Sequence, residues 1–77
     1  MDWDKLKIFH AVAEAGSFTN ATVNLNLSQS AISRQIQSLE EELKVKLFER
    51  HARGLTLTEN GEYVFRTAHE VISKLKE

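Results

Sequence analysis

Cysteine and proline are absent from this chain of 77 residues, and glycine occurs only three times. Without cysteine the chain can form neither a disulfide nor a thiolate-bound metal site, and it suits a reducing compartment. No apolar run approaches the roughly 20 residues that cross a bilayer, and the first residues, MDWDKLK, lack the apolar core of a secretion signal. The sequence therefore predicts one small domain of a cytoplasmic protein without a membrane partner.

An excess of positive charge is also absent, because the formal net charge is −1 and the isoelectric point is about 6.3. This balance alone argues against a nucleic-acid partner, since most nucleic-acid-binding domains carry excess Lys and Arg. The stretch 44–53 differs, with four basic side chains and one acidic one. Glu40, Glu41 and Glu42, just before it, should point away from any phosphate. The charge pattern thus leaves nucleic-acid binding open.

Three helices are predicted in the first half of the chain by the spacing of apolar residues. The first ends at Gly16, and Ser17 then offers an N-cap oxygen to a short second helix. Asn26, which tolerates a left-handed conformation, and the cap Ser28 precede a third helix over residues 29 to about 43 or 44. This is the spacing of a helix-turn-helix, although an ordinary corner of a helical bundle has it too.

The stretch after the third helix predicts a two-stranded ribbon. Residues 47–50 and 55–58 alternate between apolar and polar, and 51–54 form a glycine-containing loop with a basic tip. Two strands alone are only marginally stable, so the ribbon must lean on the helices. Thr58 then caps a last helix, with Glu59 in its first turn. The expected fold is mainly α: three helices, a two-stranded β wing and a C-terminal helix.

The third helix has two different faces at about 100° per residue. The apolar face should pack on the first two helices, and it holds Ile32, Ile36, Leu39 and Leu43. The polar face holds Gln29, Ser30, Ser33, Arg34 and Gln37. Gln can pair with an adenine edge, Arg with a guanine edge, and Ser lets the helix backbone approach closely. The polar face therefore suits a DNA major groove, with a plain solvated surface as the alternative.

The basic residues of the ribbon offer a second contact. Arg50 and Arg53 can lie along a phosphate backbone or enter a narrow minor groove. The position of Arg53 at the glycine-containing tip favours contact, whereas Lys46 is equally compatible with simple solvation.

Four motifs, in their order and spacing, resemble those of a known family. They are Gly16-Ser17-Phe18, the run LSQSAISRQI from position 27, LFER from position 47 and LTENG from position 57. In combination they are similar to the N-terminal winged helix-turn-helix domain of LysR-type transcriptional regulators. The resemblance runs from about Leu6 to the last helix.

The resemblance implies a bacterial transcription factor that binds double-stranded DNA as a homodimer at an operator of the inverted-repeat type. It implies a DNA-binding unit over 1–58, with the helix-turn-helix at about 18–37 and the wing at about 47–58, followed by a linker and dimerisation helix over 59–77. A small-molecule inducer is expected only for a C-terminal domain that this chain lacks. The chain is therefore expected to be either an excised DNA-binding domain or a naturally short protein, and its end within a helix favours the former.

The resemblance also implies roles for individual residues. Base-edge contacts are expected at Gln29, Ser30, Ser33, Arg34 and Gln37. Contacts to the DNA backbone are expected at Ser17, Thr19, Ser28, Lys46, Arg50 and Arg53. The apolar stripe of the last helix is expected to form the dimer, through Val64, Ala68, Val71, Ile72 and Leu75.

Two positions depart from the family pattern in ways that bear on the site. Ser30 stands where the family commonly has proline, so its hydroxyl can change which base is contacted. Lys44 stands where the family usually has the glycine that ends the third helix. Either Lys44 adopts a strained left-handed conformation, or the helix ends differently.

Other classes of function find little support in the residues. No nucleophile-elbow or phosphate-binding glycine pattern is present, so the chain is not expected to be an enzyme. His10, His51 and His69 have no cysteine or close histidine–aspartate pair in sequence, so neither a metal site nor a cofactor is predicted. A protein-interaction module that dimerises through residues 59–77 is the remaining alternative.

Overall fold

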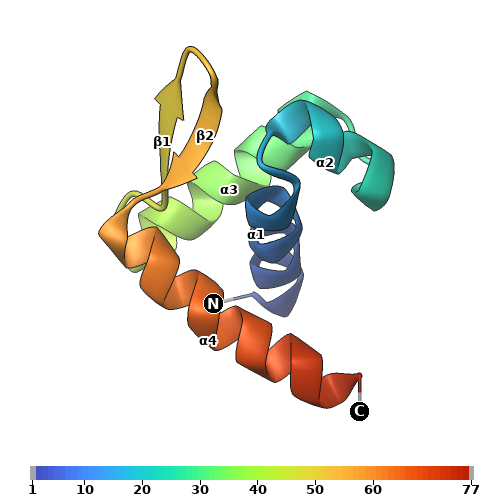
Figure 1. Cartoon of the computed structure of the whole chain (residues 1–77), viewed down its shortest axis with the longest axis vertical. Helices are drawn as coiled ribbons and strands as arrows, with labels where there is room; N and C mark the ends of the chain where they lie inside the picture. Colours follow the sequence, from blue (N-terminus) through green and yellow to red (C-terminus); the bar gives the residue numbers. More distant parts are fainter. Residues whose placement is uncertain (1, 77) are drawn as a thin grey trace.

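The computed structural model describes residues 2–76 of the chain. Its elements in order are α1 (Trp3–Ala15), α2 (Phe18–Leu25), α3 (Gln29–Leu43), β1 (Phe48–His51), β2 (Gly54–Leu57) and α4 (Glu59–Leu75). Figure 1 shows α1, α2 and α3 gathered together, with the two strands projecting beside α3 and α4 running below them. The mainly helical winged fold predicted from the sequence is confirmed.

The core lies where the three helices meet and is closed by the start of the wing. Its fully buried side chains come from every part of this junction: Phe9, Val12, Ala21, Ile32, Leu39 and Leu47. Each large apolar side chain removed from water contributes about 1.5–3 kcal/mol. The Phe48 ring lies 5.3 Å from that of Phe9 and 6.2 Å from that of Phe18, measured between centroids, so the wing packs on α1 and α2 through aromatic contacts.

Four helices begin at side-chain caps that the sequence predicts. The backbone N–H groups of Asn20, Ala31 and Gly61 donate to the hydroxyls of Ser17, Ser28 and Thr58 at 3.0, 3.1 and 2.9 Å. Asp2 caps α1 in the same way, through the N–H of Asp4 at 2.9 Å. Each cap satisfies one of the N–H groups that a helix start leaves unpaired, and the predicted starts are confirmed.

Three helices end at a residue in the left-handed region. Gly16 has φ 76°, Asn26 has φ 55° and Lys44 has φ 60°. Glycine enters this region freely and asparagine tolerates it, whereas a lysine there is strained by its Cβ. The first of the two alternatives for Lys44 is therefore the one observed: α3 ends where a glycine would end it, with a lysine in the same conformation.

The wing consists of two antiparallel strands, and the residue range of each is shifted by one from the predicted range. The register pairs Phe48 with Leu57 and His51 with Gly54, so Ala52 and Arg53 alone form the turn. Leu47 does not join β1, because its side chain fills the core and its N–H donates to Glu40 Oε2 at 2.8 Å. Glu40 therefore faces the start of the wing, where its carboxylate accepts from a backbone N–H.

A close backbone approach joins the wing to α4. The Thr58 hydroxyl donates to the carbonyl of Lys46 at 2.6 Å, and the Thr58 N–H donates to the carbonyl of Leu47 at 3.0 Å. Gly61 lies so near this strand that a Cβ on it would fall 2.0 Å from the Leu47 carbonyl oxygen. The start of α4 can approach the wing only because position 61 has no side chain.

α1 and α4 meet at two histidines. His10 is only 7% exposed, and its Nε2 lies 2.9 Å from Nδ1 of His69. These residues are 59 positions apart, so the sequence offers no local sign of the pair.

Lys44→Gly should stabilise the fold. Relief of the left-handed strain is worth roughly 1–2 kcal/mol, and the greater freedom of glycine in the unfolded chain offsets about 0.5–1 kcal/mol of it. We expect urea titration to show a free energy of unfolding higher by roughly 0.5–1 kcal/mol. Lys44→Ala, which loses the same side chain but keeps its Cβ, is the control and should not gain this stability. Equal stability of the two variants would contradict strain at Lys44.

Gly61→Ala should destabilise the fold even though alanine is the better helix former by about 1 kcal/mol. The added methyl would meet the Leu47 carbonyl, and we expect a net loss of roughly 1–3 kcal/mol in the same titration. Asn60→Ala, at the exposed neighbouring position, is the control and should stay within about 0.5 kcal/mol of the wild type. If Gly61→Ala were as stable as Asn60→Ala, the wing would move away from the added methyl without any loss in the free energy of unfolding.

Candidate nucleic-acid interface

The polar side chains predicted on the third helix share one outward face of α3. Gln29, Ser30, Arg34 and Gln37 are exposed and Ser33 is half-buried. The opposite face buries Ile32, Ile36 and Leu39 in the core. The division of α3 into an anchored face and a free face therefore follows the sequence pattern.

The corner between α2 and α3 places hydroxyl groups beside two helix starts. The Ser28 hydroxyl accepts from Ala31 N–H and lies 3.4 Å from the Ser30 hydroxyl, while the Ser17 hydroxyl caps α2. A hydroxyl that accepts one hydrogen bond still has its own proton to donate. Thr19 is exposed in the first turn of α2. Together with the positive end of each helix dipole, these groups suit an anion such as phosphate.

Arg50 lies between the wing and α3 rather than at the wing tip. Its guanidinium carbon is 4.7 Å from the centroid of the Phe18 ring, a cation–π distance. Its Nη2 lies 3.5 Å from the Ser33 hydroxyl, at the outer limit of a hydrogen bond. A groove between α3 and β1, lined in part by Ser33, Gln37, Lys46 and Arg50, follows from this arrangement.

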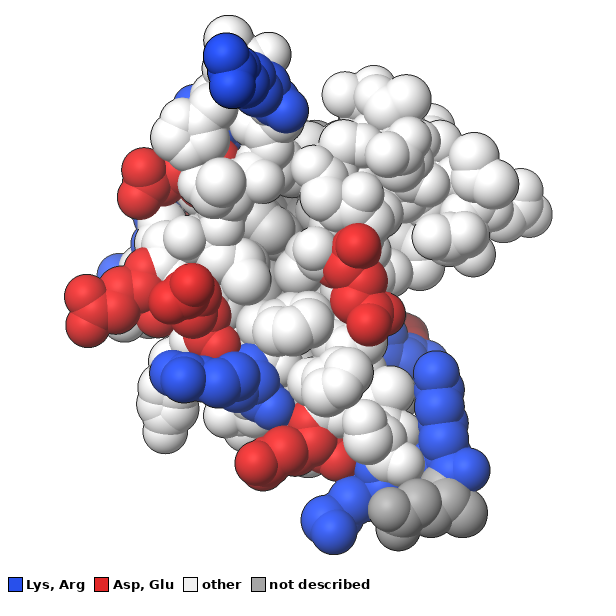
Figure 2. Space-filling model, viewed as in Figure 1, with Lys and Arg blue, Asp and Glu red and all other residues white. Residues whose placement is uncertain are grey.

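The other two basic residues of this region project further from the helices. Arg53 is exposed in the two-residue turn of the wing, and Figure 2 shows basic atoms at the wing's end. The Lys46 side chain is also exposed, with Nζ 3.9 Å from Glu40 Oε1, so a carboxylate of α3 partly balances its charge. Of the two, Arg53 is the cation with no acidic side chain within ion-pair distance among residues 2–76.

The α2–α3 corner itself is uncharged. From position 15 to position 33 the sequence contains no Asp, Glu, Lys or Arg, and the surface of α2 in Figure 2 is correspondingly white. The residues that determine the net charge of the chain lie outside this stretch, so the net charge does not describe the α2–α3 corner. Sequence reasoning missed this feature, although the length of the uncharged run is visible in the letters.

The apolar stripe predicted on the last helix divides between two surfaces. Ala68 is fully buried by the chain itself, and Val64 packs against the core cluster. Ile72 is half-buried, whereas Val71 and Leu75 are 43% and 70% exposed. Ala68 therefore has no surface to offer a partner, because α1 covers it; Tyr63, 62% exposed, is an outward residue that the stripe omitted.

Among residues 2–76, no helix is both long enough and apolar enough to cross a membrane.

Comparison with known proteins identifies the family. The model for "Bacterial regulatory helix-turn-helix protein, lysR family" matches residues 3–62. An uncharacterized HTH-type transcriptional regulator of Azotobacter vinelandii is 43% identical over the whole chain, which covers 54% of that protein. The regulator YbhD of Escherichia coli is 44% identical over 94% of the chain, which covers 23% of YbhD. The chain thus spans about half or less of the length of these relatives.

Solved structures share this fold, and their sequence identity to the chain is similar to that of the relatives above. The DNA-binding domain of BenM, in a complex with catB site 1 DNA, superposes with a TM-score of 0.92 and 39% identity, over 99% of this chain and 85% of that one. The chain therefore belongs to the lysR family of bacterial regulatory helix-turn-helix proteins, a family of transcriptional regulators rather than enzymes, and corresponds to its winged helix-turn-helix DNA-binding domain.

Proposed function

We propose that this domain binds a specific sequence of double-stranded DNA, with α3 in the major groove and the wing at the flanking minor groove, and that it does so as a homodimer through α4. The observation that carries the proposal is the free polar face of α3, which is exposed while the opposite face is fixed in the core. The similar BenM domain, solved in a complex with DNA, supports DNA as the ligand. As a regulator of bacterial genes, the protein would act in the cytoplasm.

Base recognition rests on the outward side chains of α3. Arg34 can donate two parallel hydrogen bonds to guanine, and Gln29 or Gln37 can bond both edge atoms of adenine. Ser33 and Ser30 are small, so the helix axis can lie close to the bases. The hydroxyl of Ser30, 3.4 Å from that of Ser28, is placed to bond either a base or a phosphate.

Contacts to the DNA backbone divide between neutral and charged groups. Ser17, Thr19 and Ser28 lie at helix starts, where hydroxyl and N–H groups bind phosphate without a formal charge. Arg53 extends from the wing turn toward the flanking groove. Arg50 stacks on Phe18 beside Ser33, so it is placed to bind a phosphate at the edge of the major groove and to hold the wing at a fixed distance from α3.

The dimer contact is proposed for the exposed apolar residues at the C-terminal end of α4. Val71 and Leu75 are exposed and one helical turn apart. They follow Ala68 on the same face of α4, which is buried at Ala68 and exposed further along the helix. Nearer the start of α4, an apolar hollow lined by Leu6, Tyr63, Val64, Thr67 and Ala68 can receive a side chain of the second copy. The linker and dimerisation helix over 59–77 is thus anchored to its own domain by Ala68 and exposed at Val71 and Leu75.

Arg34→Ala should relax sequence discrimination. We expect it to lower the preference for one base pair by about 1–3 kcal/mol while sparing affinity for unrelated DNA. Selection from a random duplex pool supplies the bound sequence, and fluorescence anisotropy with single-base variants of that duplex measures the preference. An Arg34→Ala protein with the wild-type order of preference at every base pair would refute this role.

Arg53→Ala should weaken binding by a similar factor on all sequences. Loss of one phosphate contact per protomer should also reduce the slope of log affinity against log salt by roughly 1 for each protomer. Lys7→Ala, which removes one positive charge from α1, is the control and should leave the slope unchanged. Salt-independent binding of the wild type would overturn the DNA-binding proposal itself.

A Val71→Lys and Leu75→Lys double variant should be monomeric with its fold intact. Two lysines on an apolar contact would have to be desolvated in the dimer, which is unfavourable. Sedimentation equilibrium measures the mass, and circular dichroism checks the helices. Ser73→Lys with Glu70→Gln adds the same charge to other exposed positions of α4 and should remain dimeric. An unchanged mass in the first variant would refute the interface.

A further inference from the structure

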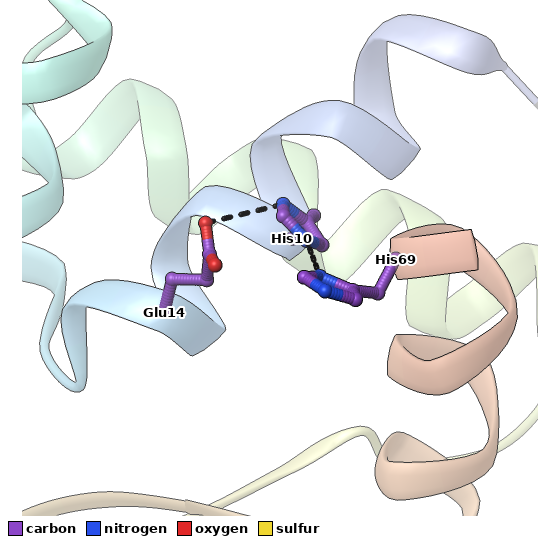
Figure 3. Close-up of side chains that lie close together, drawn as sticks. All are labelled: His10, Glu14 and His69. Atoms are coloured by element: carbon purple, nitrogen blue, oxygen red, sulfur yellow. Dashed lines mark hydrogen bonds and ion pairs between the residues drawn. The ribbon is translucent and has the colours of Figure 1, made fainter. Parts of the chain in front are cut away.

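Three metal-ligating side chains converge where α1 meets α4 (Figure 3). His10 and Glu14 are one turn apart on α1, with His10 Nδ1 3.6 Å from Glu14 Oε1. His69 reaches across from α4 and places its Nδ1 2.9 Å from His10 Nε2. One ligand atom from each of the three lies within 4.8 Å of the others. None of these residues belongs to the polar face of α3 or to the wing.

We propose that His10, His69 and Glu14 bind a divalent transition-metal ion of the zinc class between α1 and α4. Two imidazole nitrogens and one carboxylate oxygen are a ligand set typical of zinc, and water completes a tetrahedron. Bonds of about 2.0–2.1 Å at tetrahedral angles separate two ligand atoms by roughly 3.3 Å. The histidine nitrogens lie 2.9 Å apart, and Glu14 faces the other nitrogen of His10. A slight separation of the two rings and a rotation of the Glu14 side chain would therefore admit the ion.

The His10 ring is held in place by its packing. It is only 7% exposed, and Phe65 lies nearly parallel to it at 5.0 Å between centroids. Packing of this kind fixes the direction of a ligand before the ion arrives.

The simpler account is that the two histidines only hydrogen-bond each other. A hydrogen bond between the histidines involves two residues only. The Glu14 carboxylate, a third group that can bind metal, also has an oxygen within 4.8 Å of a nitrogen of each histidine. His69 and Glu14 are exposed, so an ion can reach the site from solvent without unfolding the domain. A bound ion would tie α4 to α1 and thereby fix the direction in which Val71 and Leu75 point. The site itself does not depend on DNA binding or on the dimer.

The test is titration of the untagged 77-residue chain with Zn²⁺ at pH 7.5, followed by calorimetry. We expect one ion per chain and a thermal midpoint that rises with Zn²⁺ concentration. Co²⁺ in place of Zn²⁺ should give the visible absorption of a four-coordinate ion. Ca²⁺ and Mg²⁺ should not bind, because they prefer sites built from oxygen ligands.

Variants separate this site from adventitious binding. His69→Ala, at an exposed position, should fold and lose the Zn²⁺ response, and Glu14→Gln should weaken binding about tenfold or more. His51→Ala, which removes the histidine of the wing, is the matched control and should bind as the wild type does. Retained binding in His69→Ala, loss in His51→Ala, or no binding by the wild type up to millimolar Zn²⁺ would each overturn the proposal. Circular dichroism of His69→Ala confirms that any loss is not unfolding.

Discussion

The backbone of Leu47 holds the recognition helix, the wing and the last helix together. Its N–H donates to a carboxylate of α3, its carbonyl accepts from Thr58 at the start of α4, and its side chain is fully buried. Gly61 packs directly against the same carbonyl. A buried backbone group without a partner is unfavourable, so these contacts cannot be exchanged for others one at a time. Leu47 thus links α3 to the wing and to α4 through both its backbone and its side chain.

The outward face of α3 can be polar because the helix is held by its opposite face. The polar side chains of α3 make few contacts with the rest of the chain, but the helix that carries them is fixed by Ile32, Ile36 and Leu39 on its other side. Arg50, held between Phe18 and Ser33, adds a contact between the wing and the helix at the surface itself. Rigidity thus comes from beneath the surface, and the polar side chains remain free to bond a ligand.

Local features of the structure could be predicted from the sequence, whereas pairings across the fold could not. Caps such as Ser28 and the two faces of α3 depend on neighbouring residues, whose spacing is visible in the letters. The bounds of each strand differ by one residue from the predicted ones, because the buried Leu47 lies outside β1. The division of the α4 stripe between Ala68 and Leu75 depends on where α1 lies. The meeting of His10 with His69 depends on the same packing, which no periodicity contains.

The uncharged run from position 15 to position 33 bears on the order of events when the domain meets DNA. Long-range attraction to phosphate acts on charges, and in this region charges are found on the wing and at Arg34 rather than on α2 or the start of α3. Hydrogen bonds from serine and glutamine act only over contact distance. Under the proposed function, the first encounter would be guided by the wing, and the corner would engage after docking. Differences between right and wrong sequences should then be expressed in how long the domain stays bound, not in how fast it arrives.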